Sequence, residues 1–182
     1  MPANTLPAKS IRFADLWKNY PNNDPCMNPR TGKKAYDDQC AIRLGAALQN
    51  SGVNFSSFRG PRCEFGPPSN GMALRAQELA EWLQKKPWSG CPMPIPMTGK
   101  DFVKKLQGRT GIVFFKDYWL REGEKSPTGD HIDLWNISQL TPSFTTFLRF
   151  RFGIARMPNF VGSGNYYSDL GNSRQILFWQ LP

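Results

Sequence analysis

The sequence predicts one α+β domain in which helices come first along the chain and the strands of an antiparallel sheet follow. Apolar residues recur at helical spacing in the N-terminal half, and short apolar or alternating runs replace them afterwards. The 182 residues are 40% hydrophobic and 13% aromatic, which excludes a disordered or coiled-coil chain and suffices for one core. We therefore expect residues 1–182 to form a single domain.

Four helices are expected, over residues 10–20, 37–50, 71–86 and 98–106. Ser10 can cap the first helix, and either Asp37 or Asp38 can cap the second. Thr98, with Asp101 three residues later, resembles a capping box at the start of the fourth. The apolar face of the first helix comprises Phe13, Leu16, Trp17 and Tyr20.

Three strands are expected, over residues 111–115, 131–136 and 176–179. The first is a continuous apolar run, typical of a strand buried on both faces. The second alternates, which places His131, Asp133 and Trp135 on one face. Loops are expected over residues 21–34, 53–71, 87–97, 117–129 and 162–171, and residues 144–152 form either a helix or a long connection.

The chain is basic, with 23 lysines and arginines against 14 acidic residues and a formal net charge of +9. Such an excess of positive charge favours anionic partners such as nucleic acid, cell-wall polymers or acidic proteins. The alternative is that the charge only keeps the chain soluble. The first twenty residues lack the apolar core of a signal peptide, and no run is long enough to span a membrane. We expect a protein made in the cytoplasm that reaches any other compartment without a cleaved leader.

The cysteines and the sole histidine restrict the possible chemistry. Cys26, Cys40, Cys63 and Cys91 contain no C-x-x-C spacing, which argues against a zinc ribbon, a zinc finger or a dithiol redox site. A single histidine also excludes any three-histidine metal site. If the protein uses an imidazole of its own, that imidazole belongs to His131.

Cys40 and His131 together form a candidate catalytic pair. Cys40 falls in the first turn of an expected helix, where the partial positive charge of the helix terminus favours a thiolate. An adjacent imidazole can take the thiol proton, and backbone N–H groups at the helix end can stabilise an oxyanion. A helix bearing cysteine followed by a strand bearing histidine is the chain order of papain-like folds. The alternative is structural, with Cys40 on the apolar stripe of its helix and His131 in a strand.

Three segments carry a resemblance to a known family: CAIRL at residues 40–44, GDHIDLWN at 129–136 and ILFW at 176–179. They resemble the type VI secretion amidase effectors of the fourth family, which are papain-like, NlpC-type cysteine peptidases. The resemblance implies that a cysteine at a helix N-terminus meets a histidine carried by an antiparallel sheet. The order and approximate spacing of the segments cover most of the chain.

The resemblance implies a peptidoglycan amidase that cleaves the D-glutamyl–meso-diaminopimelate amide of the stem peptide through a thiol acyl-enzyme. Cys40 would match the nucleophile, and His131 the general base and later acid; no metal or cofactor is implied. The implied partners are bacterial peptidoglycan, the type VI secretion machinery and a cognate immunity protein, with no nucleic acid and no membrane. The implied site of action is the periplasm of a rival bacterium.

The third catalytic residue is less well defined by the resemblance. The family often places an aspartate about eleven residues beyond the histidine, where this chain has Pro142. We take Asp133 in its place, since it lies two residues from His131 on the same strand face, with Cβ atoms roughly 6–7 Å apart. Asp130 and Asn136 are weaker candidates because they should point to the opposite face.

Two further residues are candidates for binding substrate. Arg43, one helical turn after Cys40, can clamp a substrate carboxylate or form an ion pair that braces the helix. Trp135 extends the face of His131 and can line the groove or belong to the core. A Cys63–Cys91 disulfide, formed after export to an oxidising compartment, is a further hypothesis.

Two other functions stay open from the sequence. A basic nucleic-acid-binding module is indicated by the interleaved cationic and aromatic residues 147–152, although the chain has no recognised nucleic-acid motif. A thiol-dependent acyltransferase on the same fold would share Cys40 and His131 and would differ only in the acceptor.

Overall fold

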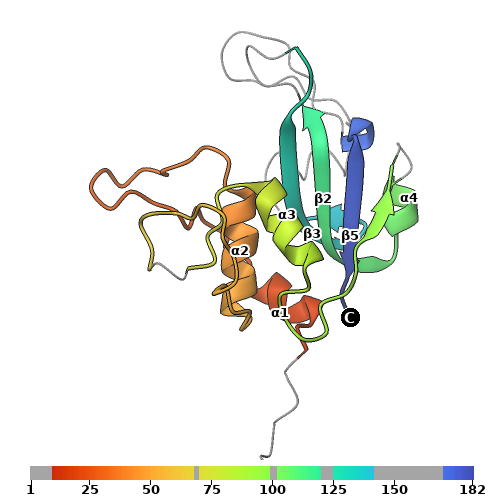
Figure 1. The fold of residues 1–182 in the computed structure, drawn as a ribbon, viewed down its shortest axis with the longest axis horizontal. Helices are drawn as coiled ribbons and strands as arrows, with labels where there is room; N and C mark the ends of the chain where they lie inside the picture. Colours follow the sequence, from red (N-terminus) through yellow and green to blue (C-terminus); the bar gives the residue numbers. More distant parts are fainter. Residues whose placement is uncertain (1–9, 68–69, 99–101, 120–124, 142–169) are drawn as a thin grey trace, which may run out of the picture.

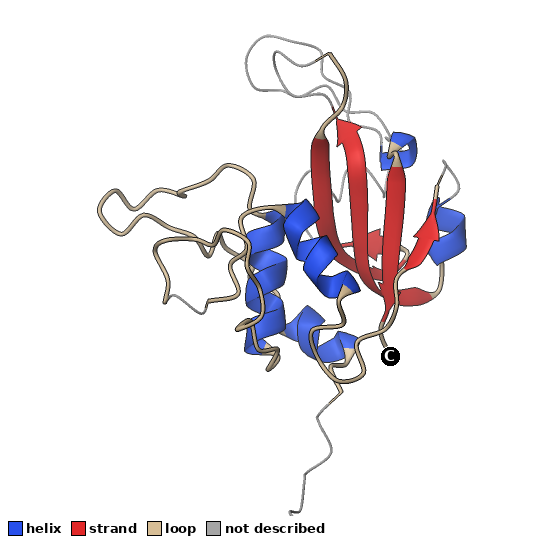
Figure 2. Ribbon diagram, viewed as in Figure 1, coloured by secondary structure: helices blue, strands red, loops and turns tan. Residues whose placement is uncertain are grey.

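A computed structural model describes residues 10–67, 70–98, 102–119, 125–141 and 170–182. In this part of the chain, helices α1, α2 and α3 gather on one side of an antiparallel sheet, and α4 lies at its other end beside β1 (Figure 1). The chain end returns to the helical side, where the N–H of Phe13 donates to the carbonyl of Pro182 at 2.8 Å. Figure 2 shows the same segregation of helices and strands.

The four expected helices are present and shorter than predicted: α1 is Phe13–Lys18, α2 Cys40–Asn50, α3 Ala76–Gln84 and α4 Phe102–Leu106. The predicted caps Ser10, Asp37 and Asp38 are wrong, because α1 and α2 begin after Arg12 and Gln39, and neither of these makes a side-chain cap. For α2, a tertiary contact of the N-cap residue explains where the helix begins. The Gln39 amide bonds the backbone N–H and carbonyl of Cys26, 3.2 Å from each.

Among the described residues, the sheet has five strands in the order β1-β5-β2-β3-β4, and all neighbours are antiparallel. The strands are β1 Ile95–Met97, β2 Arg109–Trp119, β3 Gly129–Ile137, β4 Gln139–Leu140 and β5 Gln175–Gln180. The three predicted strands are therefore confirmed. The loop predicted over 117–129 is shorter, because β2 and β3 extend into it from both ends.

The sequence pattern missed β1 and β4. β1 lies in the proline-rich segment 87–97, which was expected to be loop, and it contains Pro96. Proline lacks a backbone N–H, but an edge strand has one side without ladder partners and tolerates it. β4 is a two-residue strand that pairs with Trp135 and Asn136 of β3, and it is too short to show alternation.

Both faces of the sheet are covered by apolar side chains. Ile112, Phe114, Ile132, Leu134, Leu177 and Trp179 belong to the core cluster shared with α1, α2 and α3. The opposite cluster contains Val113, Phe115, Trp135, Leu140, Ile176 and Phe178, together with Phe102 and Leu106 of α4. The prediction that the 111–115 run is buried on both faces is thus confirmed.

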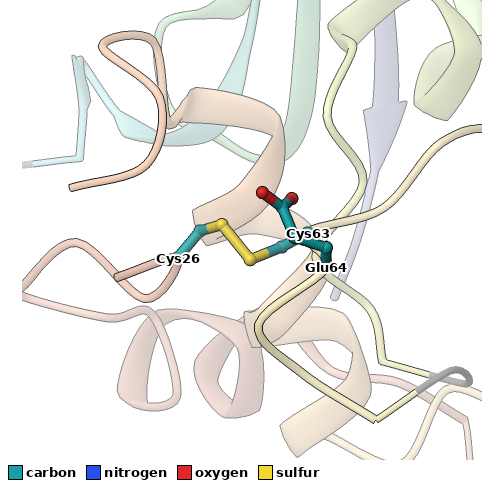
Figure 3. A group of neighbouring side chains, drawn as sticks. All are labelled: Cys26, Cys63 and Glu64. Carbon is teal, nitrogen blue, oxygen red and sulfur yellow. A yellow bond between two sulfur atoms is a disulfide. The ribbon is translucent and has the colours of Figure 1, made fainter. Parts of the chain in front are cut away.

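One disulfide is present, and it is not the one expected. Cys26 and Cys63 are bonded, with Cα atoms 5.9 Å apart (Figure 3). The Cys63–Cys91 hypothesis is wrong, because Cys91 is a free, buried thiol of the main core whose Sγ lies 3.7 Å from the carbonyl oxygen of Leu83. Burial raises the pKa of the Cys91 thiol to about 11, so it is an inert core residue at neutral pH.

Several predicted features fall outside the described residues. These are Asp101 of the proposed capping box, Pro142, the segment 144–152 with its basic and aromatic residues 147–152, and most of the loop 162–171. Within the described part of the chain, no helix combines the length and the apolar character needed to cross a membrane.

Candidate active site

Cys40 is the first residue of α2, directly after the N-cap Gln39. Its thiol is free and partly exposed, and it packs at the margin of the main core cluster. The backbone N–H groups of the first helical turn have no carbonyl partners within the helix, so this end carries a partial positive charge. The position therefore offers a thiol nucleophile together with donors for an oxyanion.

The fold brings His131 of β3 into hydrogen-bond contact with Cys40. The other side of the imidazole faces Asp133, whose Oδ2 lies 3.5 Å from Nε2 of His131. Since Nε2 is turned towards Asp133, Nδ1 is the nitrogen available to the thiol. The side chain of His131 is 22% exposed and that of Asp133 only 3%, so substrate can reach the imidazole while the carboxylate behind it is shielded.

The charge distribution favours a protonated His131. Burial disfavours the imidazolium, but the hydrogen bonds to Asp133 and Cys40 and the charge on Cys40 outweigh it and raise the pKa of His131 well above its ordinary value. The rings of Phe115 and Tyr118 lie against the imidazole, each with its centroid 6.3 Å from that of His131. The imidazole is thus fixed between a thiol, a carboxylate and two aromatic rings.

Asp133 is itself held by neighbours that sequence reasoning did not select. Its Oδ1 accepts hydrogen bonds from the N–H of Leu134 at 2.8 Å and from Oγ1 of Thr141 at 2.6 Å. The hydroxyl of Tyr20 interacts with both Asp133 and Thr141. Tyr20 was expected only as part of an apolar helix face, and Thr141 had no predicted role. A hydrogen bond from either residue to Asp133 leaves no local pattern in the sequence by which it could be predicted.

The weaker candidates for the third position lie elsewhere. Asp130 accepts a hydrogen bond from the backbone N–H of Asp117 at 2.9 Å, across the β2–β3 pair. Asn136 lies towards the far end of β3, in the β4 pairing region. Of the three carboxylate or amide side chains considered, Asp133 is the one placed beside the imidazole.

The two predicted substrate-binding residues have different surroundings. Arg43 has a partner within the protein, since its guanidinium lies 2.6 Å from Oδ1 of Asp24, and its Nε is buried without a hydrogen bond. Of the two interpretations of Arg43, the structure therefore contains the ion pair that braces the helix, which was the alternative to a clamp for a substrate carboxylate. The prediction that Trp135 lines the groove is wrong, because its side chain is fully buried and its Nε1 donates to the carbonyl of Leu106 at 2.9 Å.

One group of potential metal ligands occurs in the described part of the chain, formed by Cys26, Cys63 and Glu64 (Figure 3). The two sulfurs are bonded to each other and therefore offer no thiolate. The Glu64 carboxylate instead accepts a hydrogen bond from the hydroxyl of Tyr36 at 2.8 Å. The group is a disulfide beside an exposed carboxylate.

Structural comparison finds several similar folds. The effector Tae4 from Salmonella typhimurium, in complex with the immunity Tai4 from Enterobacter cloacae, has a TM-score of 0.59 and 16% identity, over 95% of this chain and 100% of that chain. The type VI effector Tae4 from Enterobacter cloacae has a TM-score of 0.60 and 15% identity, over 97% and 100%. At these identities the likeness establishes the fold, which is the papain-like, NlpC-type fold expected from the sequence.

The sequence comparison establishes the family. No curated protein matches the chain. Residues 36–179 match the family described as type VI secretion system (T6SS), amidase effector protein 4, a segment that includes Cys40, His131 and Asp133. Members of that family are delivered into target bacteria, where they hydrolyse the D-glutamyl–meso-diaminopimelate amide of peptidoglycan. The chain therefore belongs to the Tae4 family of type VI secretion amidase effectors and is a peptidoglycan amidase.

Proposed function

We propose that Cys40 is the nucleophile of this amidase, that His131 is its general base and acid, and that Asp133 orients the imidazole. The observation that carries the proposal is the contact of the sole imidazole with the Cys40 thiol on one side and Asp133 on the other. A thiol at a helix N-terminus, an imidazole and an orienting carboxylate are the parts that acyl transfer through a thioester requires.

The reaction runs in two halves. His131 takes the proton of the Cys40 thiol, and the sulfur attacks the carbonyl carbon of the D-glutamyl amide. The oxyanion that forms is stabilised by backbone N–H groups at the start of α2. His131 then gives its proton to the leaving amine of meso-diaminopimelate. Water, deprotonated by the same imidazole, hydrolyses the thioester and regenerates the free thiol.

The periplasm of the target cell is the proposed place of action, since the stem peptide lies there. A cognate immunity protein is the proposed inhibitor, and the similar effectors of known structure include complexes with Tai4. The chain's net charge of +9 would suit both an anionic wall polymer and an acidic inhibitor.

Digestion of purified sacculi tests the catalytic assignments. Wild-type protein should release the products of D-glutamyl–meso-diaminopimelate cleavage, identified by mass spectrometry. Cys40→Ala and His131→Ala should abolish release because each removes a group that bonds to, or exchanges protons with, the reacting atoms. Cys91→Ala is the matched control, since it removes the other free thiol and should leave the products unchanged.

The folded state of each variant is checked by circular dichroism. A folded Cys40→Ala or His131→Ala protein that still releases the products would refute the corresponding assignment. Loss of activity in Cys91→Ala with the fold intact would equally contradict the choice of Cys40 as the reactive thiol.

A further inference from the structure

The surroundings of Asp133 contain two hydroxyl groups that the proposed reaction does not use. They belong to Tyr20, which follows α1, and Thr141, which follows β4. Tyr20 is remote from β3 in sequence, whereas Thr141 lies only eight residues after Asp133, beyond the β3–β4 turn. A role for these hydroxyl groups rests on the proposed catalytic roles of Cys40 and His131, since both groups would act through the carboxylate beside His131.

The β3–β4 connection determines where Thr141 lies. The chain turns at Ile137, which has a positive φ of 60°, and β4 then pairs antiparallel with the end of β3. Because Leu140 pairs with Trp135, the next residue, Thr141, is brought alongside Leu134 and next to Asp133. The Thr141 side chain is buried there, so its hydroxyl needs a partner within the protein.

That partner is the Asp133 carboxylate, and its two oxygens have different tasks. Oδ1 accepts from Oγ1 of Thr141 at 2.6 Å and from the N–H of Leu134 at 2.8 Å. Oδ2 is the oxygen that faces Nε2 of His131, at 3.5 Å. Two donors on Oδ1 fix the rotation of the carboxylate about its Cβ–Cγ bond and thereby direct Oδ2 at the imidazole.

Tyr20 approaches the same carboxylate from the helical side of the molecule. Its hydroxyl is in hydrogen-bond contact with Asp133 and with Thr141. Its burial, followed by the negative charge of Asp133, raises the pKa of Tyr20 well above its ordinary value, so the phenol keeps its proton and stays a donor at neutral pH. Thr141 and Tyr20 therefore both contact Asp133.

We propose that Thr141 and Tyr20 are positioning residues of the amidase, which act on the reaction by holding Asp133 so that Oδ2 orients the imidazole of His131. In this mechanism neither hydroxyl forms a bond to the substrate or exchanges a proton with it. Their effect passes through one carboxylate, and this makes the proposal distinguishable from a general contribution to folding.

The imidazole itself provides the readout, because the chain has a single histidine. Its ring signals in NMR report one titration, which is that of His131 and needs no substrate. Thr141→Val removes the hydroxyl and keeps the shape, and Thr141→Ser keeps the hydroxyl. We expect Thr141→Val to lower the pKa of His131 and to reduce kcat on sacculi by about tenfold, the loss associated with about one net hydrogen bond. Thr141→Ser should restore both values.

A double-mutant cycle separates positioning from structure. In an Asp133→Asn background, Thr141→Val should change neither the His131 titration nor kcat any further, since the group through which it acts has been altered. Equal losses in both backgrounds, or a Thr141→Val protein with wild-type titration and kcat, would overturn the assignment of Thr141. If Thr141→Val does not fold, Tyr20→Phe is tested in its place, by its effect on the His131 titration and on kcat in the wild-type and Asp133→Asn backgrounds.

Failure of this proposal is separable from failure of the catalytic assignments. Thr141→Val and Tyr20→Phe with unchanged kcat, alongside an inactive Cys40→Ala, would refute only the positioning roles. An active, folded Cys40→Ala would refute the catalytic assignment, on which the positioning roles rest.

Discussion

At the scale of single residues, the main feature of the site is an imidazole with an acid on one side and a thiol on the other. His131 has its pKa raised by hydrogen bonds to Asp133 and Cys40, against the effect of burial. A raised pKa in the folded state means that protonation of His131 stabilises the fold below the unfolded-state pKa. This contribution is lost as pH rises through the folded-state value. With His131 in its proposed catalytic role, the same protonation equilibrium would set the alkaline limit of catalysis.

Asp133→Asn tests this link between charge and rate. The amide keeps the shape of the side chain but removes the negative charge, so we expect the pKa of His131 to fall. The alkaline limb of the kcat/KM profile on sacculi should therefore move to lower pH, because the thiolate–imidazolium pair loses its proton earlier. An alkaline limb at the wild-type pH would show that Asp133 does not govern the imidazole.

Arg43 gives a second test at this scale. Its ion pair with Asp24 is partly buried, with side chains 26% and 33% exposed. If the pair braces α2, Arg43→Ala should lower the free energy of unfolding by about 1–3 kcal/mol, as expected when a partly buried charge loses its partner. KM for sacculi should not change.

Asp24→Asn is the control for the ion pair. It leaves Arg43 in place and removes its partner, so urea unfolding should show a comparable loss of stability in the two single variants. A raised KM in Arg43→Ala with normal KM in Asp24→Asn would instead identify Arg43 as the substrate clamp.

At the scale of elements, the start of α2 depends on the Cys26–Cys63 disulfide. The bond ties the loop before α2 to the loop after it, and Gln39 then connects the Cys26 backbone to the residue that precedes Cys40. The side-chain amide of Gln39 also donates to the carbonyl of Tyr36 at 3.2 Å. Cys40, the proposed nucleophile, is thus positioned by a cross-linked loop as well as by its own helix.

Removal of this disulfide should destabilise the protein and lower its activity. For a closed loop with a sequence separation of 37 residues, reduction should cost about 2–4 kcal/mol of unfolding free energy. Denaturant unfolding with and without reductant measures this loss of unfolding free energy. The measurement is best made in a Cys40→Ala background, which has no thiol at position 40 to exchange with the disulfide. Activity of Cys26→Ser/Cys63→Ser protein should fall in parallel; unchanged stability and activity would contradict the linkage through Gln39.

At the scale of the whole molecule, the active site is a junction between two differently built halves. Cys40 comes from a helix that packs on the β3 side of the sheet, and His131 comes from that strand. Tyr20 and Thr141 approach from the end of α1 and the end of β4. Each half contributes part of the proposed catalytic set, so this arrangement exists only when the helical layer is docked on the sheet.

Much of this arrangement could be predicted because it depends on local patterns. Helical spacing located three helices and a capping-box pattern the fourth, the apolar run 111–115 located the doubly buried β2, and alternation put His131 and Asp133 on one face. The motif residues around Cys40 and His131 then indicated the family, which the match over residues 36–179 confirms.

The errors have a common physical origin in contacts between distant segments. Trp135 shares a strand face with His131, yet α4 covers that part of the sheet and buries the indole completely. Gln39 replaced the expected aspartate caps because its side chain bonds Cys26. Cys63 paired with Cys26 because the fold brings their Cα atoms within 5.9 Å, while Cys91 is packed inside the main core.

By itself, the sequence determined the types of element, their order, the thiol–imidazole pair and the family. Periodicity and short motifs are properties of neighbouring residues, and they persist whatever the rest of the chain does. The tertiary structure alone decided which cysteine closes the disulfide, that Trp135 is core, and that Tyr20 and Thr141 surround Asp133. Apart from the Thr141–Asp133 contact, which the short β3–β4 connection makes, those outcomes depend on the docking of segments that are far apart in the chain, where burial and hydrogen-bond satisfaction select one set of partners.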